Sequence, residues 1–149
     1  MDIILVFIAV AVVFFLIVMA IDCHRFVIKE YTCSSPKLYQ EGKIVLLSDL
    51  HNKSFGKNNE KLIEAIDKQS PNLIVIAGDM YTSSPKEDNA GAADFVCALA
   101  GKYPVYYGNG NHEHKTKLYT DVFGERYQSY ANRLKEAGVV VLENERITL

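Results

Sequence analysis

The sequence has little net charge and few cysteines. Its formal net charge is −2 over 149 residues, so it lacks the basic field with which proteins attract nucleic acid, and we expect no nucleic-acid partner. The three cysteines, Cys23, Cys33 and Cys97, have no C-x-x-C spacing and indicate neither a zinc knuckle nor a disulfide framework. No internal repeat or low-complexity tract is present. A chain of this length suits about one domain.

A long hydrophobic run extends from Ile3 to Ile21. About twenty helical residues cross the roughly 30 Å hydrocarbon core of a bilayer, so residues 1–22 are predicted to be a single-pass transmembrane anchor. A cleaved signal peptide is the alternative, but no Lys or Arg precedes the run, and the run exceeds the usual length of a signal sequence. The Lys and Arg residues that follow the run predict that the downstream domain lies on the cytoplasmic side of the cell membrane.

The segment after the run, residues 23–42, is expected to be a linker with an edge strand. Within it Arg25 to Cys33 is rich in β-formers and carries charges near its middle, a pattern typical of an edge strand.

Residues 43–149 alternate between apolar runs of strand length and amphipathic helical patterns. Strands are expected within Lys43–Leu47, Asn72–Ala77, Tyr103–Tyr107 and Val139–Leu142. Helices are expected over Asn58–Gln69, from Asp88 or Asn89 to Ala100, and over Glu125–Ala137. This alternation predicts βαβ units and a mainly parallel sheet of the α/β class. The first strand is expected to be buried on both faces and the last to be buried as well.

Residues of metal-ligand type follow three of these strands: Asp49 and His51, then Asp79, then Asn111 and His112. Side chains at i and i+2 of an extended backbone point to the same side, so the first pair is expected to converge on one ion. Ligands of open α/β sheets bind beyond the carboxyl ends of the strands, where all three groups lie. Taken singly, Asp79 after a glycine is also typical of a turn, and Asn111 of a helix cap.

Three separated blocks, Asp49-Leu-His51, Gly78-Asp79 and Gly108-Asn-Gly-Asn-His-Glu113, resemble the first signature blocks of the calcineurin-like metallophosphoesterases. The apolar N-terminus is similar to that of membrane-associated bacterial members. The resemblance implies an αββα sandwich, of which residues 43–149 would supply only the N-terminal βαβαβ part. It also implies hydrolysis of phosphomonoesters or phosphodiesters with two divalent ions, and a mixed Asp, His and Asn donor set suits Mn, Fe or Zn.

The same resemblance implies a role for each ligand. Asp49 and His51 would hold the first ion, Asp79 would bridge the pair through its two oxygens, and Asn111 would hold the second ion through its amide oxygen.

His112 resembles the family's catalytic histidine, which contacts the phosphate and protonates the leaving group. Glu113 is expected to orient a histidine from behind. His114 has no motif support and is expected to be a loop residue.

The sequence departs from the family pattern after these blocks, because no Gly-His-x-His block follows them. Four protein ligands leave a two-metal site open, so we expect the chain to be the N-terminal part of a longer enzyme and to be inactive alone. The alternatives are a non-catalytic fragment that docks on a partner, and a metal-dependent nuclease of the same fold. The anchor hints at a lipid-linked or membrane-proximal phosphoester substrate.

Overall fold

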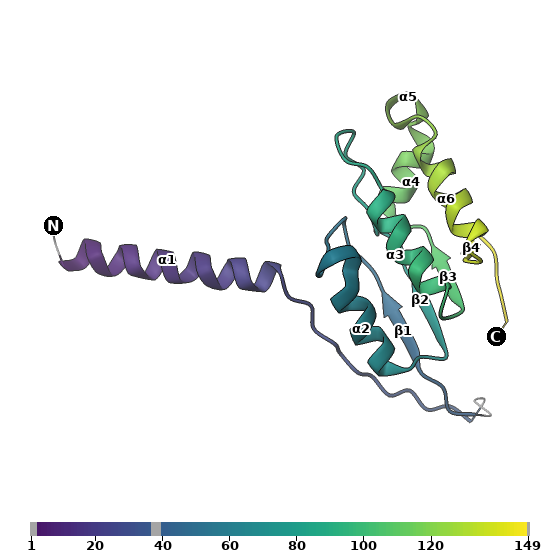
Figure 1. Cartoon of the computed structure of the whole chain (residues 1–149), viewed down its shortest axis with the longest axis horizontal. Helices are drawn as coiled ribbons and strands as arrows, with labels where there is room; N and C mark the ends of the chain where they lie inside the picture. Colours follow the sequence, from purple (N-terminus) through teal and green to yellow (C-terminus); the bar gives the residue numbers. More distant parts are fainter. Residues whose placement is uncertain (1–2, 37–39, 149) are drawn as a thin grey trace. The chain divides into compact units, whose positions relative to one another are not determined.

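The structure is a computed structural model that describes residues 3–36 and 40–148 (Figure 1). The chain divides into two compact units, Met1–Tyr39 and Gln40–Leu149, and each is described by itself. The second unit carries every predicted site residue.

The first unit contains helix α1, Ile3–Cys23. In the described part of the chain it is the one helix long and apolar enough to span a membrane, although a signal sequence near the N-terminus has the same features. The expected edge strand over Arg25 to Cys33 is wrong, because residues 24–36 form no strand. A strand needs a hydrogen-bonded neighbour, and no strand of the described sheet pairs with this segment.

The second unit is built on a four-stranded parallel sheet in the order β1-β2-β3-β4, which confirms the α/β prediction. The strands are β1 (Ile44–Leu47), β2 (Leu73–Ile76), β3 (Val105–Gly108) and β4 (Val140–Leu142). Val45 lies opposite Ile74, and Ile74 lies opposite Val105. Short apolar, largely β-branched runs favour this arrangement because their side chains pack on both sides of a pleated backbone.

Three helices connect consecutive strands: α2 (Glu60–Gln69), α3 (Ala90–Ala100) and α6 (Arg126–Glu136). Each begins and ends within about two residues of its predicted bounds. The sequence did not predict η1 (Lys57–Asn59), α4 (Asn111–Leu118) or α5 (Thr120–Phe123), and α4 places His114 on a helix rather than in a loop.

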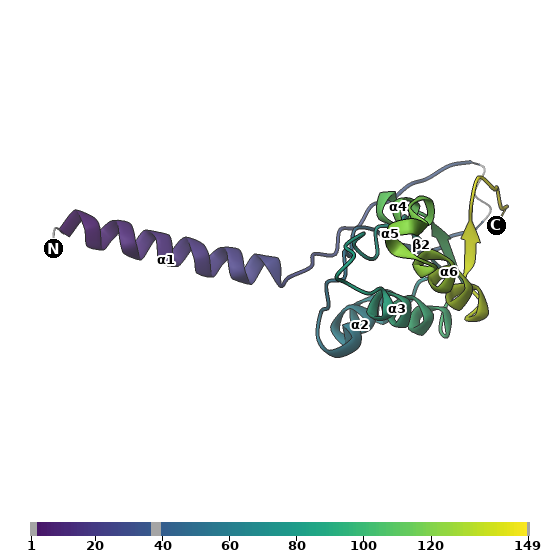
Figure 2. The same ribbon diagram turned by 90° about the horizontal axis from the view of Figure 1, so that it is seen from above.

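The hydrophobic core lies on one face of the sheet. Ile74, Ile76 and Tyr107 are almost fully buried there. The expectation that β1 is buried on both faces is wrong, since Ile44 and Leu46 remain 59% and 67% exposed, and β4 is only partly covered. Crossovers between parallel strands are right-handed. Each strand of this sheet lies on the same side of the strand before it, so the helices that connect them lie on one face of the sheet (Figures 1 and 2). The described residues include no second layer over the other face.

Candidate metal centre

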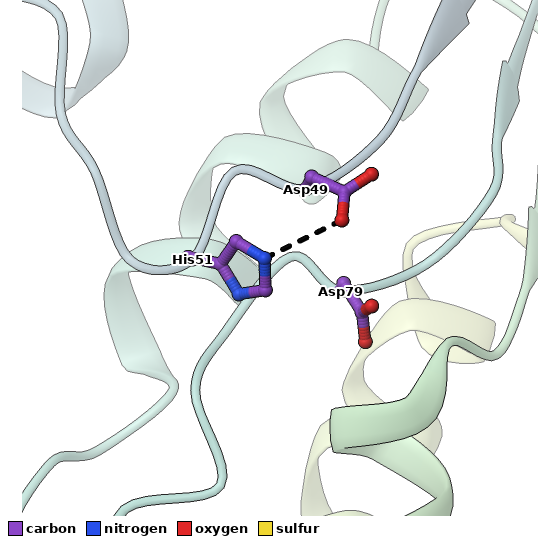
Figure 3. A group of neighbouring side chains, drawn as sticks. All are labelled: Asp49, His51 and Asp79. Carbon is purple, nitrogen blue, oxygen red and sulfur yellow. Dashed lines mark ion pairs between the residues drawn. The ribbon is translucent and has the colours of Figure 1, made fainter.

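Three side chains from two loops gather at the carboxyl edge of the sheet. Asp49 and His51 follow β1, and Asp79 follows β2 (Figure 3). One potential ligand atom from each residue lies within 4.8 Å of the others. His51 Nε2 is 3.4 Å from Asp49 Oδ1. The prediction that these three side chains converge is therefore consistent with the geometry.

The backbone brings these side chains together in a way that the sequence did not predict. Asp49, His51 and Asp79 have φ angles of 58°, 48° and 54°, in the left-handed region, and the extended backbone assumed for the Asp49–His51 pair is wrong. Residues other than glycine seldom adopt this conformation, and it concentrates at functional sites where surrounding contacts enforce it. The convergence comes from tight turns rather than from strand alternation.

The loops after β1 and β2 remain hydrogen-bonded beyond the ends of the strands. The Asp49 N–H donates to the Gly78 carbonyl at 3.2 Å, and the His51 N–H donates to the Asp79 carbonyl at 3.0 Å. These bonds extend the strand pairing into the ligand-bearing turns. The two loops therefore form one unit, and the spacing between their side chains is fixed by the backbone.

The loop after β3 packs so closely against the Asp79 turn that only glycines fit. A Cβ atom on Gly78 would lie 2.0 Å from the Gly110 nitrogen, and one on Gly110 would lie 2.4 Å from Asp79 Oδ1. Gly78 also has a φ of +80°. The glycines of the second and third signature blocks thus permit direct contact between the two loops.

We expect Gly78→Ala to lower the free energy of unfolding by about 2–3 kcal/mol, because the methyl group clashes with backbone and the left-handed φ disfavours Ala. Urea denaturation of the whole chain in detergent, followed by tyrosine fluorescence, measures this change. Gly91→Ala is the matched control, since nothing lies within 4 Å of a Cβ atom there. Equal stability of the two variants would show that the loops can separate at no cost.

Glu113 lies beneath this contact with no exposed surface. Its carboxylate accepts four hydrogen bonds: from the backbone N–H groups of Asp79 (2.8 Å), Met80 (3.0 Å) and Gly110 (3.0 Å), and from the Tyr107 hydroxyl (2.7 Å). The sequence predicted that Glu113 orients a histidine. The structure instead shows it holding the backbone of the Asp79 turn and the first turn of α4, so any effect on His112 passes through the backbone.

His112 and Asn111 begin α4. The His112 N–H donates to Asp79 Oδ1 at 2.8 Å, which ties the start of α4 to the Asp79 carboxylate. The His112 ring contacts His51 edge to face, with 4.9 Å between ring centroids. Its Nδ1 faces Ser83, a residue that the sequence analysis did not single out. Asn111 is exposed as the first helical residue, after Gly110 as N-cap, so the reading of Asn111 as a cap is wrong.

Local hydrogen bonds favour ionised Asp49. The Ser48 hydroxyl donates to Asp49 Oδ2, and this bond is the main cause that holds the pKa of Asp49 below its usual range. Desolvation opposes it, and the nearby His51 adds to the lowering. Asp49 is therefore a carboxylate at neutral pH, the form that binds cations.

Buried tyrosines pack next to Glu113 and form hydrogen bonds there. Burial raises the pKa of Tyr81 to about 12 and also raises the pKa of Tyr107. The Tyr130 hydroxyl donates to Tyr107, which donates to Glu113. These phenols stay protonated and act as hydrogen-bond donors.

The fourth strand also ends in a carboxylate that the sequence analysis missed. Glu143 accepts hydrogen bonds from the Tyr127 hydroxyl, from Asn109 Nδ2 at 3.1 Å and from Lys117 Nζ at 2.5 Å. The Lys117 ammonium, followed by Tyr127, lowers its pKa to about 2. Glu143 thus holds the loop after β3 through Asn109, the residue before the one that Glu113 contacts. Its position just after a strand, at the same edge as the other site residues, was the available signal.

A cavity of about 570 Å³ opens beside His51. It lies between the loop after β1, including Asn52 and Lys53, and the segment that leads into and begins α3, including Asp88 before the helix and Ala92 within it. The loop after β1 therefore lines a space large enough for a small organic group.

The donor set suits a divalent ion. Two carboxylates and an imidazole within 4.8 Å of one another form an anionic cluster, and mixed oxygen and nitrogen donors are typical of Mn, Fe and Zn sites. The Asp79 carboxylate accepts the His112 N–H through Oδ1.

Comparison with known proteins gives one family and two curated relatives. The model of the calcineurin-like phosphoesterases matches residues 42–147. An uncharacterised metallophosphoesterase of Campylobacter jejuni is 33% identical over 95 residues, which are 58% of this chain and 24% of that protein. A Caenorhabditis elegans protein that is named a putative metallophosphoesterase is 37% identical over 82 residues, which are 54% of this chain and 17% of that protein. No solved structure matches.

Proposed function

The chain belongs to the calcineurin-like phosphoesterase family, and from that premise we propose that residues 43–149 contribute to the dinuclear metal centre of a phosphoester hydrolase. The family implies metal-dependent hydrolysis of phosphoesters. The observation that carries the proposal is the cluster of Asp49, His51 and Asp79, whose ligand atoms lie within 4.8 Å of one another on left-handed turns.

In this proposal Asp49 and His51 would hold the first ion, Asp79 would be shared between the two ions, and Asn111 would hold the second through its amide oxygen. The lone pairs of Asp79 Oδ1 suffice for both the His112 N–H and an ion, because a carboxylate oxygen accepts more than one partner. When bound, two divalent ions supply charge neutralisation of the phosphate oxygens and a metal-activated water. The backbone bonds between the loops after β1 and β2 set the spacing of the donors.

His112 is the proposed proton donor to the leaving oxygen. It stands beside the ligand cluster rather than within it, with its ring against His51 and its backbone bound to Asp79. The cavity beside His51 offers a place for the alcohol part of the ester.

Four protein ligands are fewer than a dinuclear centre uses, so we propose that further donors complete it. The chain spans a quarter or less of the length of the two curated relatives, and the activity of the whole protein is itself part of the proposal. We propose α1 as a membrane anchor with the hydrolase unit on the cytoplasmic side, and a lipid-linked or membrane-proximal phosphoester as substrate. A nuclease of the same family is disfavoured by the net charge of −2.

Asp79→Asn tests the metal assignment. Replacing one carboxylate oxygen with an NH₂ group should lower the affinity for Mn²⁺ or Zn²⁺ by at least about tenfold. Losses of this size are seen even when the replaced residue only hydrogen-bonds to a metal ligand. Calorimetric titration of the whole chain in detergent measures it, with Asp121→Asn, at an exposed position of α5, as the control. If Asp79→Asn binds metal as the unaltered chain does, the bridging assignment is wrong.

Hydrolysis is tested separately in the whole protein, with nitrophenyl phosphate and bis(nitrophenyl) phosphate as mono- and diester substrates. Turnover that requires added Mn²⁺ or Zn²⁺ and disappears in Asp79→Asn supports the proposed function. Metal binding without turnover of either substrate, by the whole protein, would favour the non-catalytic alternative.

A further inference from the structure

The cavity beside His51 is lined mostly by polar groups. Its volume of about 570 Å³ lies within the roughly 300–1,000 Å³ typical of small-molecule pockets, but such pockets usually have apolar and aromatic linings. Here no Phe or Tyr of the described residues takes part, and Lys53, Glu87 and Asp88 contribute charges of both signs. An apolar ligand would remove water from these groups and leave them without partners, so the cavity suits a polar ligand.

Asn59 is a buried polar residue of this lining that has hydrogen-bonding capacity to spare. Its side chain belongs to a residue that is only 5% exposed, and its Oδ1 accepts the Phe55 N–H at 2.9 Å. Among the described residues, none accepts a hydrogen bond from its Nδ2, and none has a side-chain nitrogen that is both unpaired and sealed from solvent. Because Asn59 lines the cavity, its NH₂ group is available to a molecule bound there.

The turn around Asn59 holds this NH₂ group in place but does not require it. The φ angle of Asn59 is 60°, and the Lys61 N–H donates to the Phe55 carbonyl at 3.1 Å, so two hydrogen bonds close the turn. An aspartate would tolerate the same left-handed backbone and supply the same acceptor to Phe55. The unpaired NH₂ group is therefore the feature that indicates a ligand.

The lining offers both donors and acceptors. Lys53 and Asn59 carry N–H donors, and Glu87 and Asp88 carry carboxylate oxygens, each of which accepts more than one hydrogen bond. A hydroxyl group both donates and accepts, so a molecule with several hydroxyls can pair with both kinds of group. An ammonium ligand would pair with the acceptors alone and would be repelled by Lys53.

We propose that this cavity binds the alcohol part of the phosphoester, that this alcohol is a polyol or a sugar, and that Asn59 is a specificity-determining residue that donates to one of its hydroxyls. His51 belongs both to the ligand cluster and to the lining, so a group in the cavity lies beside the cluster. The role in hydrolysis rests on the proposed function, whereas the binding of a polyol does not.

Binding can be measured without activity, with myo-inositol as the probe. In the ¹⁵N-labelled whole chain in detergent, the side-chain amide signals of Asn59 are identified by their loss in Asn59→Asp. They should shift when myo-inositol is added and stay in place with cyclohexanol, which has the same ring and a single hydroxyl. Equal shifts with both probes, or with neither, overturn the proposal. A shift specific to myo-inositol in a protein that hydrolyses no phosphoester leaves the polyol site standing and rejects the proposed function.

Substrate preference is measured in the unaltered whole protein. The kcat/KM for myo-inositol 1-phosphate should exceed that for cyclohexyl phosphate at least about a hundredfold, because the second substrate leaves the polar lining unpaired. Equal values, or a preference for phosphoethanolamine, would contradict the assignment to a polyol. The same headgroup can come from a soluble ester or from a lipid, and turnover of glycerophosphoinositol against phosphatidylinositol in vesicles identifies the source.

Asn59→Asp separates recognition from folding, because it keeps the acceptor for Phe55 and removes the NH₂ group. It should lower the ratio of the two kcat/KM values, myo-inositol 1-phosphate over cyclohexyl phosphate, about tenfold, the usual net worth of one hydrogen bond. A merely structural role would reduce both values alike and leave the ratio unchanged. Asn132→Asp, at an exposed position of α6, is the matched control.

Gly91→Leu covers the case in which Asn59→Asp does not fold, as judged by its amide spectrum. Gly91 lines the cavity, and nothing lies within 4 Å of a Cβ atom there, so a leucine side chain can enter the cavity without displacing the protein. The same ratio should fall at least about tenfold, whereas Ala98→Leu, exposed on the same helix, should leave it unchanged. If Gly91→Leu folds and keeps the full preference, the polyol does not bind in this cavity and the proposal is wrong.

Discussion

His112→Ala is expected to lower turnover by the whole protein by about 10²–10⁴-fold, the usual contribution of a positioned proton donor. The ring stands next to the ligand cluster, and its Nδ1 is engaged by Ser83. Removing the ring therefore deletes a donor to the leaving oxygen without deleting a proposed ligand. Steady-state kinetics with an alkyl phosphate, whose leaving group needs a proton, measures the full loss.

The nature of the leaving group and the metal content discriminate between roles for His112. The loss should shrink for nitrophenyl phosphate, because nitrophenolate departs without a proton, and metal affinity should stay close to that of the unaltered protein. His114→Ala, two residues along α4 and exposed, is the matched control and should change little. Loss of one metal together with equal damage to all substrates would make His112 a ligand.

Glu113→Ala is expected to lower the free energy of unfolding by on the order of 4 kcal/mol. Three backbone N–H groups and the Tyr107 hydroxyl lose their acceptor in a fully buried position, and each such donor costs about 1–3 kcal/mol. The free energy of unfolding of a folded protein is only about 5–15 kcal/mol, so this variant should be marginally stable. Urea denaturation in detergent, with tyrosine fluorescence, provides the measurement.

Glu113→Gln preserves the shape and one oxygen of the side chain but turns an NH₂ group toward two of the donors. Its stability should lie between those of the unaltered chain and Glu113→Ala. Glu136→Ala, at an exposed position on α6, should have almost no effect. If Glu113→Ala unfolds no more easily than Glu136→Ala, the four hydrogen bonds do not hold the turns together.

The strands and the three long helices were predictable because each has a strong local signal. Ile44–Leu47 and Leu73–Ile76 are unbroken apolar runs of strand length, and α2 has its apolar residues at helical spacing before Pro71. Helix α4 was missed because Asn111–Leu118 is polar nearly throughout and contains no apolar stripe. It is stabilised by Glu113 and by packing against α6, which are tertiary effects.

The ligand positions were predictable from residue type and from their place after strands, but the geometry was not. Asp and His adopt left-handed φ angles more often than most residues, but too rarely for residue type alone to predict such turns at Asp49, His51 and Asp79. The one-sided burial of β1 depends on the strand order, which the spacing of the motifs does not determine. Ser83 is an ordinary loop serine in the sequence, and only the fold places it against His112.

The dependence of the Asp79 turn on Glu113 also sets an order for folding during synthesis. Every pair of neighbouring strands is consecutive in the chain, so the sheet can grow strand by strand as the polypeptide leaves the ribosome. The acceptor for the Asp79 N–H, however, is 34 residues further along the chain. A nascent chain that ends between these two residues contains Asp49, His51 and Asp79 but leaves the backbone donors of the turn without their acceptor. We therefore expect a nascent chain to gain tight affinity for divalent metal only after Glu113 has emerged.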